Sequence, residues 1–447
     1  MIGGGIAGLL AARVLTNHFE RVTLIERDQL PAGMRARKGI PQGRMPHVMM
    51  PRGEQIIERL FPGYSRELEA AGAVALRMPV DALVLTPAGW MDRRSTGWPM
   101  HSASRPLFEG VLHRRVRDLP GVTILDGHDV TALLTSPDRR QVTGMVLRRL
   151  NDPAGTTELV ADLIVDASGR SSRAPAWLAE AGYPAPTTTR VDPDVGYAAR
   201  IYRIPPDFSA DWQVVLLFSQ PPSMPRTGFL LPIEDRQWML GLMGAAGQHP
   251  PTDEDGFAAF IRSLRHPIIA DVLASAEPVT PIRAYRGTAN LLRHYERMAR
   301  RPERFVVLGD GVCAFNPVYG QGMTTAAIAA ETLDACLGRQ RLDGLAQRFQ
   351  RRLARRNADP WMLSTSEDLR FPATTGMNVN IMTRLMHRYL DRLVPVVLQD
   401  QRIAEIYLQV FGMLARPSAL FAPRILAAVA RTKPSHVGDA MPPARPS

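Results

Sequence analysis

The stretch "MIGGGIAGLLAARVL" (residues 1–15) decides the fold, because three of its glycines fit the spacing G-x-G-x-x-G. Gly3 would permit a tight turn, Gly5 would let a pyrophosphate approach the backbone, and Gly8 would let the helix pack closely on a strand. The helix that follows would direct free N–H groups and its positive dipole end at the phosphates. The stretch therefore predicts a dinucleotide-binding loop.

The strand and the acid after this helix complete a βαβ unit. Residues 21–27 (RVTLIER) predict a short strand, and Glu26 lies near its end, followed by Arg27. A carboxylate at this distance from the glycines can accept hydrogen bonds from the ribose hydroxyls of a dinucleotide. Loop, helix, strand and acid together are a much more specific signal than the glycines alone.

A second motif begins at residues 305–310 (FVVLGD) and continues into the turn NPVYGQG. Asp310 ends an apolar strand, where an acid can hold a sugar or ribityl hydroxyl. The helix start around Gly322, Met323 and Thr324 would direct its positive dipole end at an electron-rich group, such as a reduced flavin. An ordinary helix-opening turn would not explain an acid, two glycines and a proline together.

A third segment, residues 163–173 (LIVDASGRSSR), is less specific. Asp166 and Gly169 predict a tight turn after a strand, and Arg170 and Arg173 bring positive charge to it. A surface turn explains this segment equally well when it is taken alone.

The order of these motifs predicts an α/β fold: a discontinuous Rossmann-like domain, an inserted mostly β substrate domain and a C-terminal helical region. Residues 196–245 alternate between apolar and polar positions as strands of a separate sheet would. The expected ranges are 1–79, 101–175 and 286–345 for the nucleotide-binding domain, 80–100 for a substrate-domain hairpin, 176–285 for the substrate sheet and 346–447 for the C-terminal helices.

Composition excludes several classes of protein. The net charge of +11 comes almost wholly from arginine, because Lys38 and Lys433 are the only lysines. These arginines are scattered and lack interleaved aromatic residues, which argues against nucleic-acid binding. Cys313 and Cys336 form neither a disulfide framework nor a metal-binding spacing, so we expect a reducing, cytoplasmic location and no metal. No apolar run reaches the ~18 residues of a membrane span.

The three motifs resemble the FAD-dependent aromatic hydroxylase and epoxidase superfamily, which has the p-hydroxybenzoate hydroxylase type fold. The resemblance covers residues 1–345. The segments RKGIPQGRMPH (37–47) and NPVYGQGM (316–323) resemble one branch more closely. That branch contains bacterial squalene-epoxidase-like enzymes and the epoxidases that oxidise polyene precursors of polyether antibiotics. The segment DPWMLSTSEDLRFP (359–372) resembles it less specifically.

The resemblance implies FAD as the cofactor. Gly3, Gly5 and Gly8 would hold its pyrophosphate, Glu26 its adenosine ribose and Asp310 its ribityl chain. The resemblance also implies a set of further contacts, with Arg37 and Arg44 along the pyrophosphate or near the flavin, Arg105 reaching from another side, Val130 offering its backbone to adenine, and Arg27, Asp166, Gly169, Pro317, Gly320, Gly322 and Met323 completing the site. One departure is that Ala167 and Ser168 separate Asp166 from Gly169, where the superfamily has an adjacent D-G pair.

The chemistry implied is that of a monooxygenase. Reduced flavin would react with O2 to give a C4a-hydroperoxide, which epoxidises or hydroxylates a large apolar substrate such as a polyene, polyketide or terpenoid, in secondary metabolism. The protein would supply orientation and a dry pocket. No second nucleotide loop is recognisable, so either NAD(P)H binds transiently or a separate flavin reductase delivers the electrons.

Apolar residues of the substrate sheet are the candidates for the pocket wall. Alternate residues of a strand face opposite sides, and only one side can meet the substrate. For each residue taken singly, plain core packing is the alternative. The candidates are His47, Phe218, Phe229, Leu231, Trp238 and Met243.

Other activities stay open. A flavin-dependent reductase of prenyl chains has the same fold, and a non-catalytic FAD- or lipid-binding protein belongs to another class. An aromatic hydroxylase would need a base to deprotonate a phenol, for which His47, His101 and Tyr319 are candidates. Halogenation is disfavoured, because the catalytic lysine and the W-x-W-x-I-P segment of flavin halogenases are not found.

Only Met1 and Ile2 precede the glycine loop, where a buried strand of five or six residues is normal. We expect the start codon to have been placed too late, with about six strand residues missing. A chain that begins at Met1 would leave backbone groups of the neighbouring strands unpaired, which weakens the domain or its hold on FAD.

Overall fold

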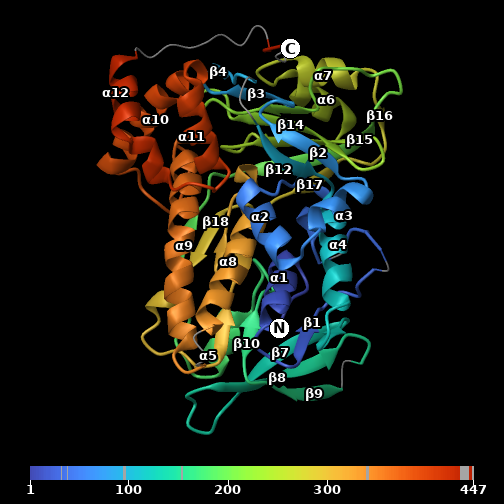
Figure 1. Cartoon of the computed structure of the whole chain (residues 1–447), viewed down its shortest axis with the longest axis vertical. Coiled ribbons are helices and arrows are strands. Elements are labelled where there is room, and N and C mark those ends of the chain that lie inside the picture. The colour runs from blue at the N-terminus through green and yellow to red at the C-terminus, as the bar shows by residue number, and fades with distance from the viewer. Residues whose placement is uncertain are drawn as a thin grey trace.

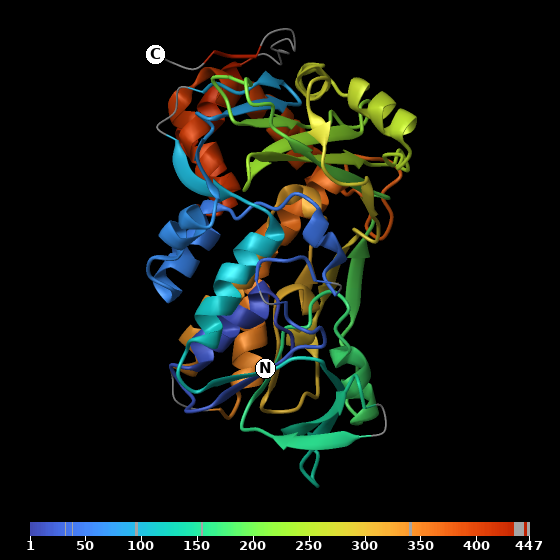
Figure 2. The same cartoon turned by 90° about the vertical axis from the view of Figure 1, so that its right-hand side faces the viewer.

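The computed structural model describes residues 1–31, 33–37, 39–93, 97–152, 155–338, 342–432 and 442–444. Figure 1 shows an elongated molecule, with a helix-covered parallel sheet in its lower half and a larger, mainly antiparallel sheet in its upper half. The C-terminal helices lie beside the upper sheet, and Figure 2 shows the same arrangement from the side. The expected fold class is confirmed.

The lower sheet is assembled from four distant pieces of chain. β1 (Val22–Ile25) pairs in parallel with β6 (Val122–Leu125), and β10 (Ile164–Asp166) pairs in parallel with β19 (Phe305–Val307). Ile2 joins the two pairs by bridging Ile25 and Asp166. Its N–H donates to the Val165 carbonyl at 2.9 Å, and the Gly3 N–H donates to the Ile25 carbonyl at 2.8 Å. The glycine loop therefore leaves the sheet at its centre.

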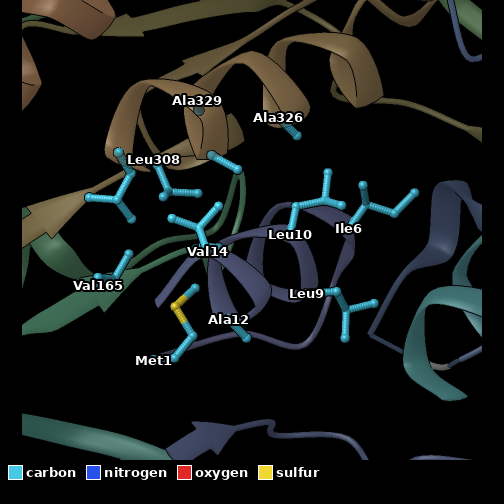
Figure 3. Close-up of a cluster of buried hydrophobic side chains, with 14 of the residues drawn as sticks. Met1, Ile6, Leu9, Leu10, Ala12, Val14, Val165, Leu308, Ala326 and Ala329 are labelled. Carbon is cyan, nitrogen blue, oxygen red and sulfur yellow. The ribbon is translucent and has the colours of Figure 1, made fainter. Parts of the chain in front are cut away.

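Two helices with small side chains cover this sheet. α1 (Ile6–Leu15) packs on α8 (Gly322–Leu337), and Figure 3 shows Ala326 and Ala329 of α8 facing the aliphatic residues of α1. Alanines at this contact allow the helix axes to approach closely. α4 (Arg105–Arg117) packs on another side of α1, and α9 (Leu345–Asp368) packs on α8. Each buried aliphatic side chain stabilises this core by roughly 1.5–3 kcal/mol.

Small antiparallel sheets and short helices surround the lower core. β7 (His128–Thr135), β8 (Val142–Arg149) and β9 (Thr156–Val160) form its base in Figure 1. The sheet of β11 (Thr188–Val191), β18 (Asn290–Arg293) and β20 (Cys313–Ala314) and the helices α2 (Pro51–Leu60), α3 (Tyr64–Ala70) and α5 (Ala174–Glu180) also belong to this group. The antiparallel pair of β2 (Val74–Met78) and β5 (Trp98–Ser102) lies higher and packs against the upper sheet.

The upper sheet has eight strands among the described residues. Its order is β16 (Glu277–Pro278), β12 (Gly196–Arg203), β15 (Gln237–Gly244), β14 (Arg226–Ile233), β13 (Val214–Leu217), β3 (Ala82–Thr86) and β4 (Gly89–Trp90), with β17 (Arg283–Tyr285) also on β12. One face is covered by α6 (Glu254–Arg262) and α7 (Ile268–Leu273). The opposite face is approached by α10 (Ile381–Gln399) and α11 (Gln401–Phe411), with α12 (Pro423–Arg431) packed behind them.

The hairpin expected over residues 80–100 is only partly present. β3 and β4 form it and join the upper sheet through β13, which runs parallel to β3. β5 pairs instead with β2, so the second half of the expected hairpin belongs to a separate ribbon. Residues 94–96 of this segment lie outside the described residues. The residue boundaries of the domains stay predictions.

Candidate cofactor and substrate site

A single cavity of about 1150 Å³ runs from the glycine loop to the C-terminal helices. It exceeds the roughly 300–1,000 Å³ of an ordinary ligand pocket, so it has room for more than one small molecule. Most of the residues that the sequence predicted for cofactor and substrate line it. They are Gly3, Gly5, Glu26, Arg27, Arg37, His47, Arg105, Val130, Gly169, Phe218, Phe229, Leu231, Met243, Asp310, Pro317, Gly320, Gly322 and Met323.

The glycine loop leaves open space where a phosphate would sit. Gly3 has φ +95°, and a Cβ there would lie 2.6 Å from the Ala167 carbonyl oxygen. A Cβ on Gly8 would lie 1.8 Å from the Gly3 carbonyl oxygen, so Gly8 holds helix and loop together without lining the cavity. A Cβ on Gly5 would meet nothing within 4 Å. Gly5 begins α1 without a side-chain cap, which leaves N–H groups for a ligand.

Paired charges fix the wall beside this loop. The Gly4 N–H donates to Glu26 Oε2 at 2.6 Å, and Arg37 Nη1 lies 3.1 Å from the same oxygen. Arg37 also bonds to Glu109, whose second oxygen accepts from Arg105 Nε at 3.0 Å. Burial alone would raise the pKa of Glu109, but Arg105, His113 and Arg37 lower it to about 2. This carboxylate therefore stays ionised and holds both arginines in place.

Sequence reasoning missed Glu109. The available signal was an acid four residues after Arg105 on an otherwise apolar helix face, a spacing that brings the two side chains together.

At the other end of the region expected to hold the cofactor, Asp310 faces the cavity, and among the described residues nothing donates a hydrogen bond to its carboxylate. Burial raises the pKa of Asp310, and the charges of Arg170, Arg105 and Arg293 oppose that rise. A half-buried acid that is balanced by charges but not hydrogen-bonded fits a ligand with hydroxyl groups.

The loop after Asp310 leads directly into α8. Gly320 has φ +64°, a left-handed conformation that ends the turn Pro317–Tyr319. Gln321 precedes α8 and makes no capping bond, so the first N–H groups of the helix face the cavity wall at Gly322 and Met323. Within the described part of the chain, the buried atoms on this lining that have no hydrogen-bond partner include Gln321 Oε1 here and Arg37 Nε near the glycines. Both fit a polar, elongated ligand such as FAD.

Four predicted residues do not line the cavity. Gly8 has the packing role given above, and the Arg44 side chain is exposed. Asp166 is buried and accepts bonds from the Ser168 N–H at 2.9 Å and the Ser172 hydroxyl at 2.5 Å, so it stabilises the turn before Gly169. The prediction that Trp238 lines the pocket is wrong. Strand alternation directs its side chain to the opposite face of the sheet, where it meets Phe208 edge to face with ring centroids 4.7 Å apart.

The end of the cavity where the sequence predicts the substrate is a largely apolar chamber. Phe218 and Phe229 meet edge to face, with ring centroids 5.4 Å apart, and Leu231 lies on the same sheet face. The opposite wall comes from α10, α11 and the turn after α11, which sequence reasoning had not assigned to the site. Besides Asp391, its cavity-lining residues are Leu390, Val394, Pro395, Tyr407, Leu408, Val410, Phe411 and Leu420.

The three candidate bases have different surroundings. The His47 ring bonds through Nδ1 to the Met45 carbonyl at 2.8 Å; burial and Arg105 lower its pKa to about 3, so the ring is neutral. Burial lowers the pKa of His101, but its bonds to Glu54 and Glu69 outweigh this and raise the pKa to about 9. Tyr319 donates to Asp368 at 2.7 Å. Among them, His47 alone is a neutral base.

Asp368 is a second residue that sequence reasoning missed. It ends α9, is 1% exposed and lies on the cavity lining. The segment 359–372 contains it, but helical periodicity does not show which of its acids turns inward.

Comparisons with known proteins agree with this geometry. The family described as FAD binding domain matches residues 1–346. Protein Rv3254 of Mycobacterium tuberculosis (strain ATCC 25618 / H37Rv) is 34% identical over 434 residues, which covers 93% of this chain and 89% of that protein.

Solved structures with the same fold include two flavoproteins of low sequence identity. The flavin-dependent brominase Bmp2 has a TM-score of 0.67 at 15% identity, over 97% of this chain and 98% of its own. PqsL, a probable FAD-dependent monooxygenase from Pseudomonas aeruginosa, has a TM-score of 0.56 at 15% identity, over 90% of this chain and 96% of its own. The predicted superfamily is thereby confirmed, while the epoxidase branch stays a prediction.

Proposed function

Because the chain belongs to the FAD-binding-domain family, we propose that it is a FAD-dependent monooxygenase acting on a large, mainly apolar substrate by epoxidation or hydroxylation. The observation that carries this proposal is the continuity of the cavity, which joins the glycine loop to the apolar chamber without an intervening wall. Bound FAD would supply the redox chemistry, taking electrons from a donor and passing them to O2.

Different residues along the cavity would bind different parts of FAD. Gly5 and the start of α1 would hold the pyrophosphate, Glu26 the ribose and Asp310 the ribityl chain. The uncapped start of α8 would face the flavin ring, where its positive dipole end stabilises negative charge on the reduced ring.

The chamber would orient the substrate and exclude water from the reacting centre. Phe218, Phe229 and Leu231 offer it an apolar wall on the sheet side, and α10 and α11 close the other side. Such a lining suits a polyene, polyketide or terpenoid, because an apolar substrate loses little by leaving water.

Aromatic hydroxylation is a second candidate that a specific observation favours. Since Nδ1 of His47 donates to a carbonyl, Nε2 carries the lone pair of this neutral ring and can accept a hydrogen bond from a phenol hydroxyl, while the low pKa makes the ring a weak base. Pro46 holds the loop against the sheet so tightly that a Cβ on Gly241 would lie 2.4 Å from Pro46 Cγ. His47 is therefore positioned to orient a phenol hydroxyl by accepting its hydrogen bond.

Halogenation is not proposed, although Bmp2 is a brominase. The sequence has no W-x-W-x-I-P segment, and its only lysines are Lys38 and Lys433, which lie outside the described residues.

The test is oxygen consumption by the FAD-loaded protein with NADPH, NADH or an added flavin reductase, against a panel of polyenes and phenols. The proposal expects substrate-stimulated oxygen uptake and one atom of labelled O2 in the product. A product saturated without oxygen uptake would establish the prenyl-reductase alternative. A halide-dependent product would also overturn the proposal.

If phenols alone are oxidised, His47→Gln should lower the rate, because the phenol hydroxyl loses the ring nitrogen that accepts its hydrogen bond. His101→Gln is the matched control, since His101 is already engaged by two carboxylates.

A further inference from the structure

Asp368 stands out as a buried carboxylate that the proposed chemistry does not use. It belongs to the C-terminal helical region, yet its side chain reaches the loop between Asp310 and α8. Three side chains donate hydrogen bonds to it: Asn290 at 2.5 Å, Asn316 at 3.0 Å and Tyr319 at 2.7 Å. A carboxylate with this many donors determines where each donor lies.

The same donors are bonded to one another and to the substrate sheet. The Asn316 N–H donates to Asn290 Oδ1 at 2.8 Å, and the Tyr197 hydroxyl donates to Asn316 Oδ1 at 2.6 Å. Ser364, one turn before Asp368, donates to Asn290 Oδ1 at 3.1 Å. The network therefore ties α9, β18, β12 and the Asn316–Tyr319 turn into one unit.

The turn held by this network is the segment expected to face the flavin ring. Asn316 also accepts from the Val318 N–H, and the left-handed Gly320 then directs the chain into α8. Tyr319 lies on the cavity lining between Pro317 and Gly320. A shift of Tyr319 or Asn316 would move the ring-facing backbone with it.

We propose that Asp368 is a positioning residue for the flavin: it fixes the Asn316–Gly320 turn through Tyr319, Asn316 and Asn290. This inference rests on the proposed placement of the ring beside that turn. It makes the C-terminal helical region part of the cofactor site, beyond the range 1–346 that matches the family. Burial raises the pKa of Asp368 to about 6 against the three donors, so the carboxylate is ionised at neutral pH.

The experiment compares FAD binding to the apoproteins of Asp368→Asn and Tyr319→Phe. In Asp368→Asn a donor group replaces one acceptor oxygen, so at least one of three buried donors loses its partner. We expect FAD affinity to fall about tenfold or more in Asp368→Asn and a few-fold in Tyr319→Phe. The visible spectrum of the remaining bound flavin should change in both variants, because the ring then meets a displaced turn.

A double variant sharpens the result. If both residues act through one turn, the double variant should bind FAD no worse than Asp368→Asn alone, a non-additive outcome. Asp359→Asn is the matched control, since Asp359 lies on the same helix and not on the cavity lining. Its FAD affinity and spectrum should equal those of the wild type.

Wild-type affinity and an unchanged spectrum in Asp368→Asn would overturn the proposal. If Asp368→Asn does not fold, Tyr319→Phe is the deciding variant. Wild-type FAD affinity and an unchanged flavin spectrum in Tyr319→Phe would then overturn the proposal. FAD titration needs no substrate, so these outcomes are independent of the oxygen-uptake test. A chain without monooxygenase activity would still show the loss of FAD affinity.

Discussion

The two ends of the cavity are built in different ways. At the cofactor end the walls are backbone turns and paired charges, most of them within motifs that are continuous in sequence. At the substrate end the walls are apolar side chains from the upper sheet and the C-terminal helices, regions more than a hundred residues apart. The first kind of wall is determined locally and the second by tertiary packing, so mutations at the two ends should have different consequences.

The largest loss of stability is expected in a variant that tests whether the two faces of the upper sheet have different roles. Trp238→Ala should cost about 4 kcal/mol of unfolding free energy, because the indole is 2% exposed beneath α6. Phe229→Ala should cost less than half of that, since its half-buried ring lines the cavity, and should instead change which substrates are accepted. Urea denaturation of both variants is the measurement; equal losses would remove the distinction between the faces.

The next largest loss of stability is expected at Gly8, and comparing it with Gly5 separates packing from ligand binding within the glycine loop. Gly8→Ala should destabilise the protein by about 3 kcal/mol, because its Cβ would lie 1.8 Å from a backbone oxygen. Gly5→Ala should leave stability unchanged and weaken FAD binding, since its Cβ points into open space. Thermal unfolding without FAD and titration with FAD measure the two properties. An unstable Gly5→Ala protein would contradict this assignment.

Asp310→Ala should lower FAD affinity about tenfold or more, as expected for a lost hydrogen bond to a charged group. The stability of the apoprotein should stay the same or rise, because the variant no longer holds a half-buried carboxylate without hydrogen bonds. Calorimetric titration and apoprotein melting curves check the two halves of this prediction. A destabilised apoprotein would mean that Asp310 has a structural partner.

The smallest effect concerns His101, which links α2, α3 and β5 through Glu54 and Glu69. Its folded pKa of about 9 lies above the unfolded value of 6.5. Its contribution is therefore complete below pH 6.5 and is lost as the pH rises to about 9. Because Glu69 is half-exposed, we expect only about 1 kcal/mol.

The difference in unfolding free energy between wild type and His101→Gln, measured from pH 6 to 9.5, isolates this contribution from other titrating groups. A difference that does not shrink with rising pH would show that His101 is not the group responsible.

Residues of G-x-G-x-x-G, Glu26 and Asp310 could be chosen from the sequence as lining residues of one cavity end, because each depends on a short local pattern; their contacts with FAD stay predictions. The sequence could not identify Glu109 or Asp368, whose roles depend on partners 72 and 52 residues away along the chain. Trp238 and Met243 illustrate the same limit, since strand alternation gives two faces but not which one meets α6. The sequence did not predict the pairing of β2 with β5, because β5 follows β3 and β4 so closely that it could equally pair with them.

The interleaved strands have a consequence for synthesis on the ribosome. The lower sheet requires strands near residues 24, 124, 165 and 306. In the upper sheet, β3 cannot pair with β13 until about 130 further residues have been synthesised. Neither sheet can close while the chain is half made, so early segments leave the exit tunnel with unpaired edges and exposed aliphatic surface. Cofactor capture is then expected only after the chain is complete, because the cavity needs both sheets.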